Sequence, residues 1–268
     1  MDRFTQIGFS QRIRLQWLEQ TANLVLAGTA RHAVLDALQA LLHDKLSVGG
    51  HAERGNREKA ITILMQIWVT VPPELACFRD IGLELLQQLS PDVHLAVHWG
   101  MTMAVYPFFG SVAGSVGRLL RLQGTAAAAQ VQRRVREKYG ERDTVSRATR
   151  RVLRTFVDWD VLAEGSTAGV YVPGQVLAVT NHRLAVWLVE AVLHTIPNNT
   201  SLLQAVINTP SLFPLTLERL PADALTTSRR MEITRQGLDD DLVMLRTHDA
   251  SKPCRRGLLR QNAGFPRC

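Results

Sequence analysis

Four arginines near the middle of the chain are spaced so that their guanidiniums could bind phosphate groups together. From residue 144 the chain reads TVSRATRRVLRTFVDW, and successive residues of an α-helix are rotated by about 100°. Such a helix has a cationic side and an apolar side, with Arg147, Arg150, Arg151 and Arg154 opposite Val145, Ala148, Val152, Phe156 and Trp159. A guanidinium is planar, permanently charged and matched to phosphate oxygens. The pattern therefore predicts an amphipathic helix whose polar face suits a phosphate-rich groove.

The same region carries most of the positive charge of the protein. Residues 118–160 contain eleven basic and five acidic residues, whereas the whole chain of 268 residues has a net charge of +7. The preceding helix and turn, and the start of the arginine helix itself, could add phosphate contacts through Arg133, Arg134, Arg136, Arg142 and Ser146. Clustered basic charge of this kind is the expected footprint of a nucleic-acid-binding protein. We therefore predict that these nine residues contact double-stranded DNA, on phosphates and on base edges.

Two other interpretations of the arginines stay open. They could form a solvated helix face that pairs with acids of the chain itself, such as Glu137 and Glu141. They could also dock an acidic surface of a partner subunit, which would make the protein an interaction scaffold. The dependence of DNA binding on salt separates these alternatives, because phosphate contacts release counterions.

Two further groups of side chains could bind a metal ion. His94 and His98 lie one helical turn apart in HLAVH, but Leu95 stands where the metalloprotease motif has a glutamate, and no third ligand follows. We interpret them as core or partly buried histidines that bond to the backbone. Asp239, Asp240 and Asp241 could hold a hard cation, but the adjoining glycine favours a solvated hairpin turn.

No catalytic motif is present in the sequence. Cys77 has no neighbouring histidine and is expected to be a small core residue. The nucleophile elbow, the phosphate-binding glycine loop and the dinucleotide fingerprint are all missing. We therefore predict a non-catalytic protein that needs no cofactor or metal. The three cysteines lack paired spacing and the N-terminus lacks a signal-peptide pattern, which predicts a cytoplasmic location.

The elements that would position these residues are mostly helices in the first half of the chain. Apolar residues recur there at intervals of three and four. The expected helices are Gln11–Gly28, Ala30–Leu46, Arg57–Val71 (a buried helix or strand) and Glu74–Leu89, with a loop at Ser47–Asn56. Residues Val93–Gly117 are apolar enough for a membrane span, but Tyr106-Pro107 and several glycines interrupt them. A buried helix followed by a second helix that begins at Pro107 is the preferred interpretation.

Around the arginine helix the expected order is helix, helix, turn, helix and hairpin. The elements are a helix from Pro107 to Gly124, a helix over Ala126–Tyr139 with Thr125 as N-cap and Gly140 after it, the arginine helix from Asp143 or Thr144 to about Trp159, and strands at Val161-Leu162 and Val170–Val172. The EGSTAG sequence between the strands indicates a small hairpin whose glycines permit the turn.

From Pro107 to Gly174 the chain resembles winged helix-turn-helix DNA-binding domains. The residues that carry the likeness are AAAAQVQRRVREKYG, the turn ERD, TVSRATRRVLRTFVDWDVL and the glycine-bearing wing. The likeness implies that the arginine helix is the recognition helix of a DNA-binding protein, with transcription regulation as one role. In element order alone, the whole chain is also similar to the DNA-binding subunit BrxA of BREX phage-defence systems, which implies a place in a larger complex.

The C-terminal part is expected to continue with helices and a second hairpin. The expected elements are an amphipathic helix at His182–Ile196, a short helix at Thr200–Asn208, broken helical turns over 211–228, and a hairpin that includes Met231–Thr234. Helices followed by a hairpin permit a second, degenerate winged helix.

These expectations define a mainly α fold with small β-hairpins and four regions. The predicted domains are an all-helical N-terminal domain at 1–106, a winged helix-turn-helix at 107–175, a helical region ending in a hairpin at 176–246, and a basic flexible tail at 247–268. The predicted partners are double-stranded DNA and other protein subunits, and a membrane is not among them.

Overall fold

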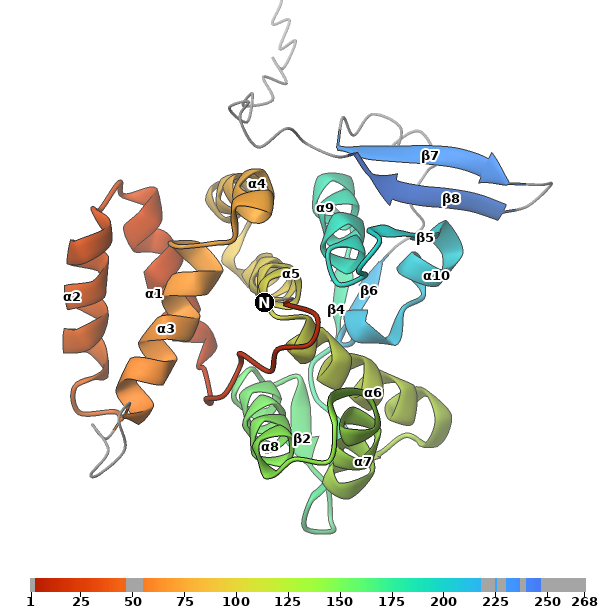
Figure 1. The fold of residues 1–268 in the computed structure, drawn as a ribbon, viewed down its shortest axis with the longest axis horizontal. Coiled ribbons are helices and arrows are strands. Elements are labelled where there is room, and N and C mark those ends of the chain that lie inside the picture. The colour runs from red at the N-terminus through yellow and green to blue at the C-terminus, as the bar shows by residue number, and fades with distance from the viewer. Residues whose placement is uncertain (1–2, 47–54, 218–224, 226–229, 237–239, 247–268) are drawn as a thin grey trace, which may run out of the picture.

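The fold is mainly helical, with ten α-helices and small sheets among the described residues (Figure 1). A computed structural model of the protein describes residues 3–46, 55–217, 225, 230–236 and 240–246. The first five α-helices are α1 Leu15–Leu26, α2 Arg31–Leu42, α3 Asn56–Trp68, α4 Ala76–Gln88 and α5 His94–Val105, with single 3₁₀ turns at η1 Pro73–Leu75 and η2 Pro91–Val93. The helices predicted for this half are confirmed, and α3 is a helix rather than a strand. The first helix begins at Leu15, however, and residues 11–14, which were expected to be part of it, are not helical. The predicted tail, 247–268, and residues 47–54 of the predicted loop lie outside the described residues.

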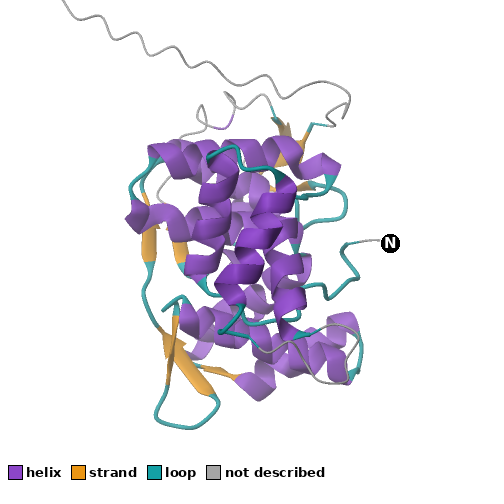
Figure 2. Ribbon diagram, turned by 90° about the vertical axis from the view of Figure 1, so that its left-hand side faces the viewer, coloured by secondary structure: helices purple, strands orange, loops and turns teal. Residues whose placement is uncertain are grey.

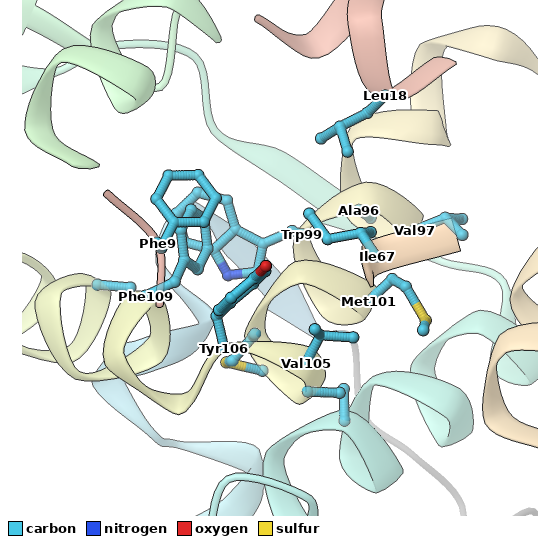
Figure 3. Close-up of a cluster of buried hydrophobic side chains, with 14 of the residues drawn as sticks. Phe9, Leu18, Ile67, Ala96, Val97, Trp99, Met101, Val105, Tyr106 and Phe109 are labelled. Carbon is cyan, nitrogen blue, oxygen red and sulfur yellow. The ribbon is translucent and has the colours of Figure 1, made fainter. Parts of the chain in front are cut away.

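Helix α5 is the centre of the molecule. Every residue from Leu95 to Val105 is buried, because α1, α3, α4, α6 and α9 all pack against this helix. Figure 3 shows Trp99 and Val105 of α5 among side chains from other elements, such as Phe9 and Ile67. A helix that is covered on all sides can be apolar all round, which accounts for the long hydrophobic run in the sequence.

The apolar stretch Val93–Gly117 forms two helices, as expected. Proline cannot continue a helix in its interior but suits the first turn, so α5 ends at Val105 and α6 (Pro107–Gln123) begins at Pro107. Within the described residues, no single helix has both the length and the apolarity to cross a membrane. One bent pair, α3 with the segment Pro73–Gln88, meets those two criteria jointly across a 52° bend.

Residues 107–175 contain the predicted order of helices and strands. After α6 come β1 Ala126–Ala127, α7 Ala128–Tyr139, α8 Asp143–Asp158, β2 Leu162–Glu164 and β3 Val170–Pro173. The three strands form an antiparallel sheet in the order β1-β3-β2. Gly124 ends α6 in a left-handed conformation (φ 71°), which glycine adopts without a steric penalty.

Thr125 is not the N-cap of the next helix, contrary to the sequence-based expectation. Ala126 and Ala127 pair with Tyr171 and Val170 of β3, so α7 starts two residues later and its N-cap residue is Ala127. The pairing satisfies backbone groups that a helix would otherwise use, and it ties the start of α7 to the hairpin.

Residues 176–246 repeat part of this arrangement. They contain β4 Leu177–Val179, α9 His182–Leu193, β5 Thr200–Leu202, α10 Leu203–Ile207, η3 Pro210–Leu212, β6 Leu215–Leu217, β7 Met231–Gln236 and β8 Asp240–Leu245. The predicted hairpin is present as β7 and β8, and the sheet β5-β8-β7 has the same order as β1-β3-β2, with its first strand beside its last. In both sheets that first strand stands between two helices, α6 and α7 or α9 and α10.

Three expectations for this region need correction. The short helix predicted at Thr200–Asn208 is divided, because residues 200–202 pair with β8 as a strand. The broken turns predicted over 211–228 include β6, which pairs in parallel with β4; residues 218–224 and 226–229 lie outside the described part. Helix α9 is buried from Trp187 to Leu193 rather than amphipathic, since α4 and α5 as well as β8 pack against it.

One continuous hydrophobic cluster joins all of these elements. It includes Trp17 of α1, Trp99 of α5, Phe156 of α8 and Val243 of β8, so it crosses the predicted domain boundaries at 106/107 and 175/176. The boundaries themselves stay a prediction. The two three-stranded sheets lie at opposite ends of the molecule, with α7, α8 and the β2–β3 hairpin at one end and the β7–β8 hairpin at the other (Figures 1 and 2).

Candidate nucleic-acid interface

Helix α8 is fixed to the core by its apolar side. Val145, Val152 and Phe156 are fully buried, and Trp159 directly after the helix is 2% exposed. The ring of Phe156 stacks on Trp99 of the central helix, with 5.0 Å between ring centroids. Burying a side chain of this kind contributes about 1.5–3 kcal/mol, so the orientation of α8 about its own axis is strongly determined.

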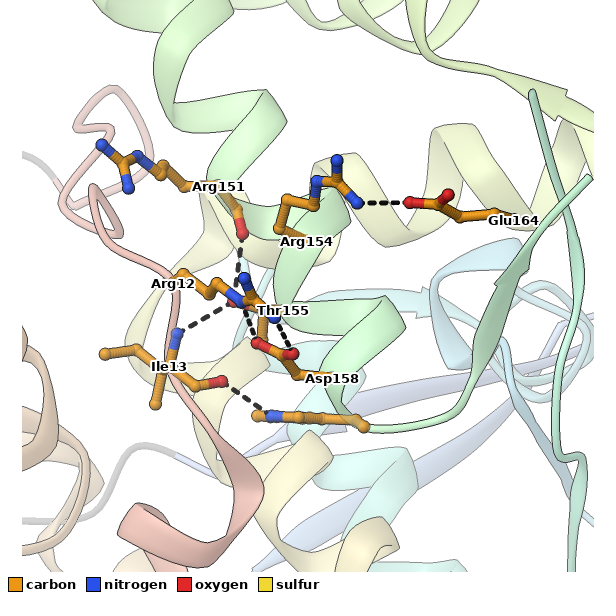
Figure 4. A network of polar contacts seen from close by, with 8 residues as sticks. Arg12, Ile13, Arg151, Arg154, Thr155, Asp158 and Glu164 are labelled. Carbon is orange, nitrogen blue, oxygen red and sulfur yellow. Dashed lines mark hydrogen bonds and ion pairs between the residues drawn. The ribbon is translucent and has the colours of Figure 1, made fainter. Parts of the chain in front are cut away.

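The opposite side of α8 carries the predicted arginines to the surface. Arg147, Arg150, Arg151 and Arg154 are all exposed. Within the part of the chain that the structure describes, only Arg154 of these four forms an ion pair, with Glu164 on β2. Figure 4 shows the guanidinium of Arg151 directed away from the polar network around it. Three cationic side chains are therefore open to a ligand along one helix face.

The arginines of α7 are placed less favourably for a ligand. Arg133 and Glu137 are an ion pair one helical turn apart, with 3.8 Å between Nε and Oε1. Arg136 Nη1 lies 3.3 Å from Oε2 of Glu141, which agrees with the interpretation that basic residues here pair with acids of the chain itself. Exposed pairs of this kind are weak, and a phosphate could compete for either arginine.

The other three predicted contact residues lie on α7, in the turn between α7 and α8, and at the start of α8. Arg134 is half-buried on α7. Arg142 is exposed, and its Nη2 donates to the carbonyl oxygen of Tyr139 at 3.0 Å. Ser146 is the fourth residue of α8, and its backbone N–H donates to the carbonyl oxygen of Arg142 at 3.3 Å. The guanidinium of Arg142 thus lies at the C-terminus of α7, and the first turn of α8 carries an acid of its own, Asp143.

The N-terminal segment packs against the C-terminal half of α8, which the sequence analysis did not foresee. The backbone N–H of Ile13 donates to Thr155 Oγ1 at 3.1 Å, and Trp159 Nε1–H donates to the carbonyl oxygen of Ile13 at 2.9 Å. Arg12 forms a bidentate pair with Asp158 (Figure 4). The sequence carried only a weak signal for this contact, because one of the alternate positions buried here, Gln11, is polar.

His94 and His98 share a carboxylate from another helix. His98 Nε2 lies 2.7 Å and His94 Nδ1 lies 3.1 Å from the two oxygens of Glu19 on α1. The expectation of burial is right, but the partner of His98 is Glu19 rather than the backbone, whereas His94 also approaches the carbonyl oxygen of Leu89. Burial lowers the pKa of His98. The hydrogen bond from His98 lowers the pKa of Glu19 from 4.5 to about 2.

The other candidate metal ligands are not brought together in the described residues. Asp240 and Asp241 are the first residues of β8 rather than members of a turn, and Asp239 lies outside the described residues. Cys77 is a half-buried free thiol on α4. Among described residues, no group of three or more histidine, cysteine, aspartate or glutamate side chains is arranged to hold a metal ion.

Comparison of the chain with protein-family models, with curated proteins and with solved structures gave no match. The geometry of the site therefore carries the functional argument without support from relatives.

Proposed function

We propose that the protein binds double-stranded DNA without catalysis, and that residues 107–175 form a winged helix-turn-helix with α8 as its recognition helix. The observation that carries the proposal is the exposure of Arg147, Arg150 and Arg151 on a helix whose other side is packed in the core. The element order α6, β1, α7, α8, β2, β3 and the strand order β1-β3-β2 support it.

The dimensions of α8 agree with this role. The major groove of B-form DNA is about 12 Å wide and admits one α-helix. α8 has 16 residues, and its cationic side extends over two turns from Arg147 to Arg154. Guanidiniums on such a helix can contact phosphates on either side of the groove and the O6 and N7 atoms of guanine.

The wider role of the protein is part of the same proposal. We place it in the cytoplasm, as a DNA-binding subunit of a larger complex of the phage-defence type, or as a transcription regulator. The absence of a catalytic motif in the sequence supports a non-catalytic role. The main alternative is a scaffold whose arginine face docks an acidic partner subunit.

A salt titration with duplex DNA tests the proposal. If about six basic groups meet phosphates, the affinity should fall by a factor on the order of a thousand between roughly 50 and 200 mM salt. Reversing two charges with Arg147→Glu and Arg151→Glu together should abolish binding, because both side chains lie on the surface that faces the groove.

A matched control separates a local effect from a general loss of charge. Arg31 is an exposed residue at the start of α2, a helix that packs against α1 and α3. Arg31→Glu should bind DNA nearly as well as the natural chain, whereas Arg151→Glu alone should bind much more weakly. Equal losses in these two single variants, or duplex binding by the double variant, would refute the proposal. Retention of an acidic protein instead of DNA by the natural chain would favour the scaffold.

A further inference from the structure

The segment from Phe9 to Arg14 is a non-helical arm that bends at Gln11 and has alternately buried and exposed side chains. Phe9, Gln11 and Ile13 are at most 4% exposed, whereas Ser10, Arg12 and Arg14 are exposed. In an extended chain alternate side chains point to opposite sides. Arg12 and Arg14 therefore point outward from the same side of this arm.

The arm lies at the end of the arginine face of α8. Arg147, Arg151, Arg154 and Asp158 are separated by four, three and four residues, so they form one line along the helix. Arg12 pairs with Asp158 at the end of that line, and Ile13 is hydrogen-bonded to Thr155 and Trp159 (Figure 4). The arm thus extends the cationic face beyond the end of the helix.

The charge of Asp158 gives Arg12 a specific role. An uncompensated carboxylate on this line would repel a phosphate backbone. Arg12 neutralises it through Nε and Nη2 and is still 46% exposed, so the guanidinium can also meet a phosphate. Arg14 adds a further positive charge, positioned by the ring of Trp17 at 5.7 Å.

The hairpin on the other side of α8 offers less positive charge. Glu164 on β2 is negatively charged and forms an ion pair with Arg154, and residues 165–169 of the hairpin are uncharged. Phosphates are therefore attracted more strongly on the side of the N-terminal arm than on the side of the hairpin.

We propose that the N-terminal arm, Ser10–Arg14, is part of the DNA-binding surface, with Arg12 and Arg14 on phosphates of the duplex whose groove receives α8. This inference rests on the proposed function. It adds a second segment of the chain, about 140 residues away in sequence, to the contact surface.

Binding of a fluorescent duplex of mixed sequence to the full chain tests the inference. Arg14→Ala should weaken binding about fivefold at physiological salt and lower the slope of log K against log salt by about 1, as the loss of one phosphate contact predicts. Arg31→Ala removes the same charge from α2 and should change neither quantity. Arg12→Ala should weaken binding more than Arg12→Ala combined with Asp158→Asn, because only the single variant leaves Asp158 uncompensated.

The outcomes distinguish this inference from the proposed function. If Arg14→Ala matches Arg31→Ala in affinity and salt slope while Arg147→Glu with Arg151→Glu still abolishes binding, the arm is not part of the surface and the proposed function stands. If the natural chain fails to bind the duplex at low salt, both proposals fall. Unfolding curves of each variant show whether a loss of affinity comes from a loss of folded protein, and a loss of affinity fully accounted for by unfolding counts against the arm.

Discussion

The indole Nε1–H of Trp159 donates a hydrogen bond to the carbonyl oxygen of Ile13, 146 residues earlier in the chain, at 2.9 Å. The hydroxyl oxygen of Thr155, one turn before Trp159, accepts a hydrogen bond from the backbone N–H of Ile13. Both backbone polar groups of a fully buried residue are thus satisfied by side chains at the end of α8. The position of the proposed recognition helix depends on the N-terminal arm as well as on its own apolar side.

Removing the hydroxyl of Thr155 should destabilise the fold. Thr155→Val keeps the shape of the side chain but leaves the buried N–H of Ile13 without an acceptor, which costs about 1–3 kcal/mol. The free energy of unfolding from urea denaturation measures the loss. Thr149→Val is the matched control on the same helix, since the buried hydroxyl of Thr149 only donates to the carbonyl oxygen of Val145 one turn earlier. Equal stability of the two variants would contradict the role given to Thr155.

Two glycines of α6 should respond in opposite ways to alanine. A Cβ on Gly117 would lie 2.2 Å from the carbonyl oxygen of Pro210, whereas a Cβ on Gly114 would meet its nearest atom, Cβ of Ser211, at 3.7 Å. Gly117→Ala forces the η3 segment away from α6 and should cost about 3 kcal/mol. Gly114→Ala should leave stability unchanged or raise it by up to about 1 kcal/mol, because alanine favours a helix. Thermal unfolding of both variants shows which of the two is less stable. A Gly117→Ala variant as stable as the natural chain would mean that α6 and η3 are not in close contact.

The elements around the candidate site could be predicted where a local pattern determines them. The alternation of arginine and apolar residues in α8 has the helical period, and the glycines of EGSTAG mark a turn between two β-prone pairs. Gly124 could be assigned as the end of α6 because glycine tolerates a left-handed conformation. Each of these signals depends on residues within a few positions of one another.

The features that were missed depend on contacts between distant residues. Thr125 is a good N-cap residue, but pairing of Ala126 and Ala127 with β3 takes precedence over this local preference. The ion pairs of Arg154 with Glu164 and of Arg12 with Asp158 bring together charges that no spacing rule relates. Tertiary contacts therefore decide which arginines are open to a ligand, and the sequence alone overestimates their number.

The buried His98 should make stability depend on pH in the mildly acidic range. Burial lowers the pKa of His98 below 6.5, so the unfolded chain takes up a proton at a higher pH than the folded chain does. Its contribution to stability is present above pH 6.5 and is lost as the pH falls below that value. The depressed pKa of Glu19 acts in the same direction at lower pH, because stability present above pH 4.5 is lost as the pH falls toward about 2.

Urea denaturation between about pH 7 and pH 5 measures the contribution of His98, because the histidine of the unfolded chain takes up its proton in this range. In His98→Gln the unfolding free energy should change less steeply with pH. The decrease in slope corresponds to at most one proton that the natural chain takes up on unfolding. His32→Gln, a change at an exposed position on α2, should keep the slope of the natural chain. If the His98→Gln slope matched that of the natural chain, a neutral buried imidazole would not be the source of the pH dependence.

The ion pair between Arg154 and Glu164 should reduce DNA affinity, because it occupies one arginine of the α8 face and places an acid beside it. Both side chains are more than half exposed, at 51% and 63%, so the pair contributes little to stability. Glu164→Gln frees the guanidinium and removes a charge that repels phosphate. We expect duplex affinity to rise about two- to fivefold at low salt, with a steeper salt dependence, as an added electrostatic contact predicts.

Asp36→Asn, which removes one negative charge from an exposed position on α2, is the control for net charge. The same increase in both variants would trace the effect to overall charge, and a decrease in Glu164→Gln would mean that the ion pair positions Arg154 for the groove instead of competing with it.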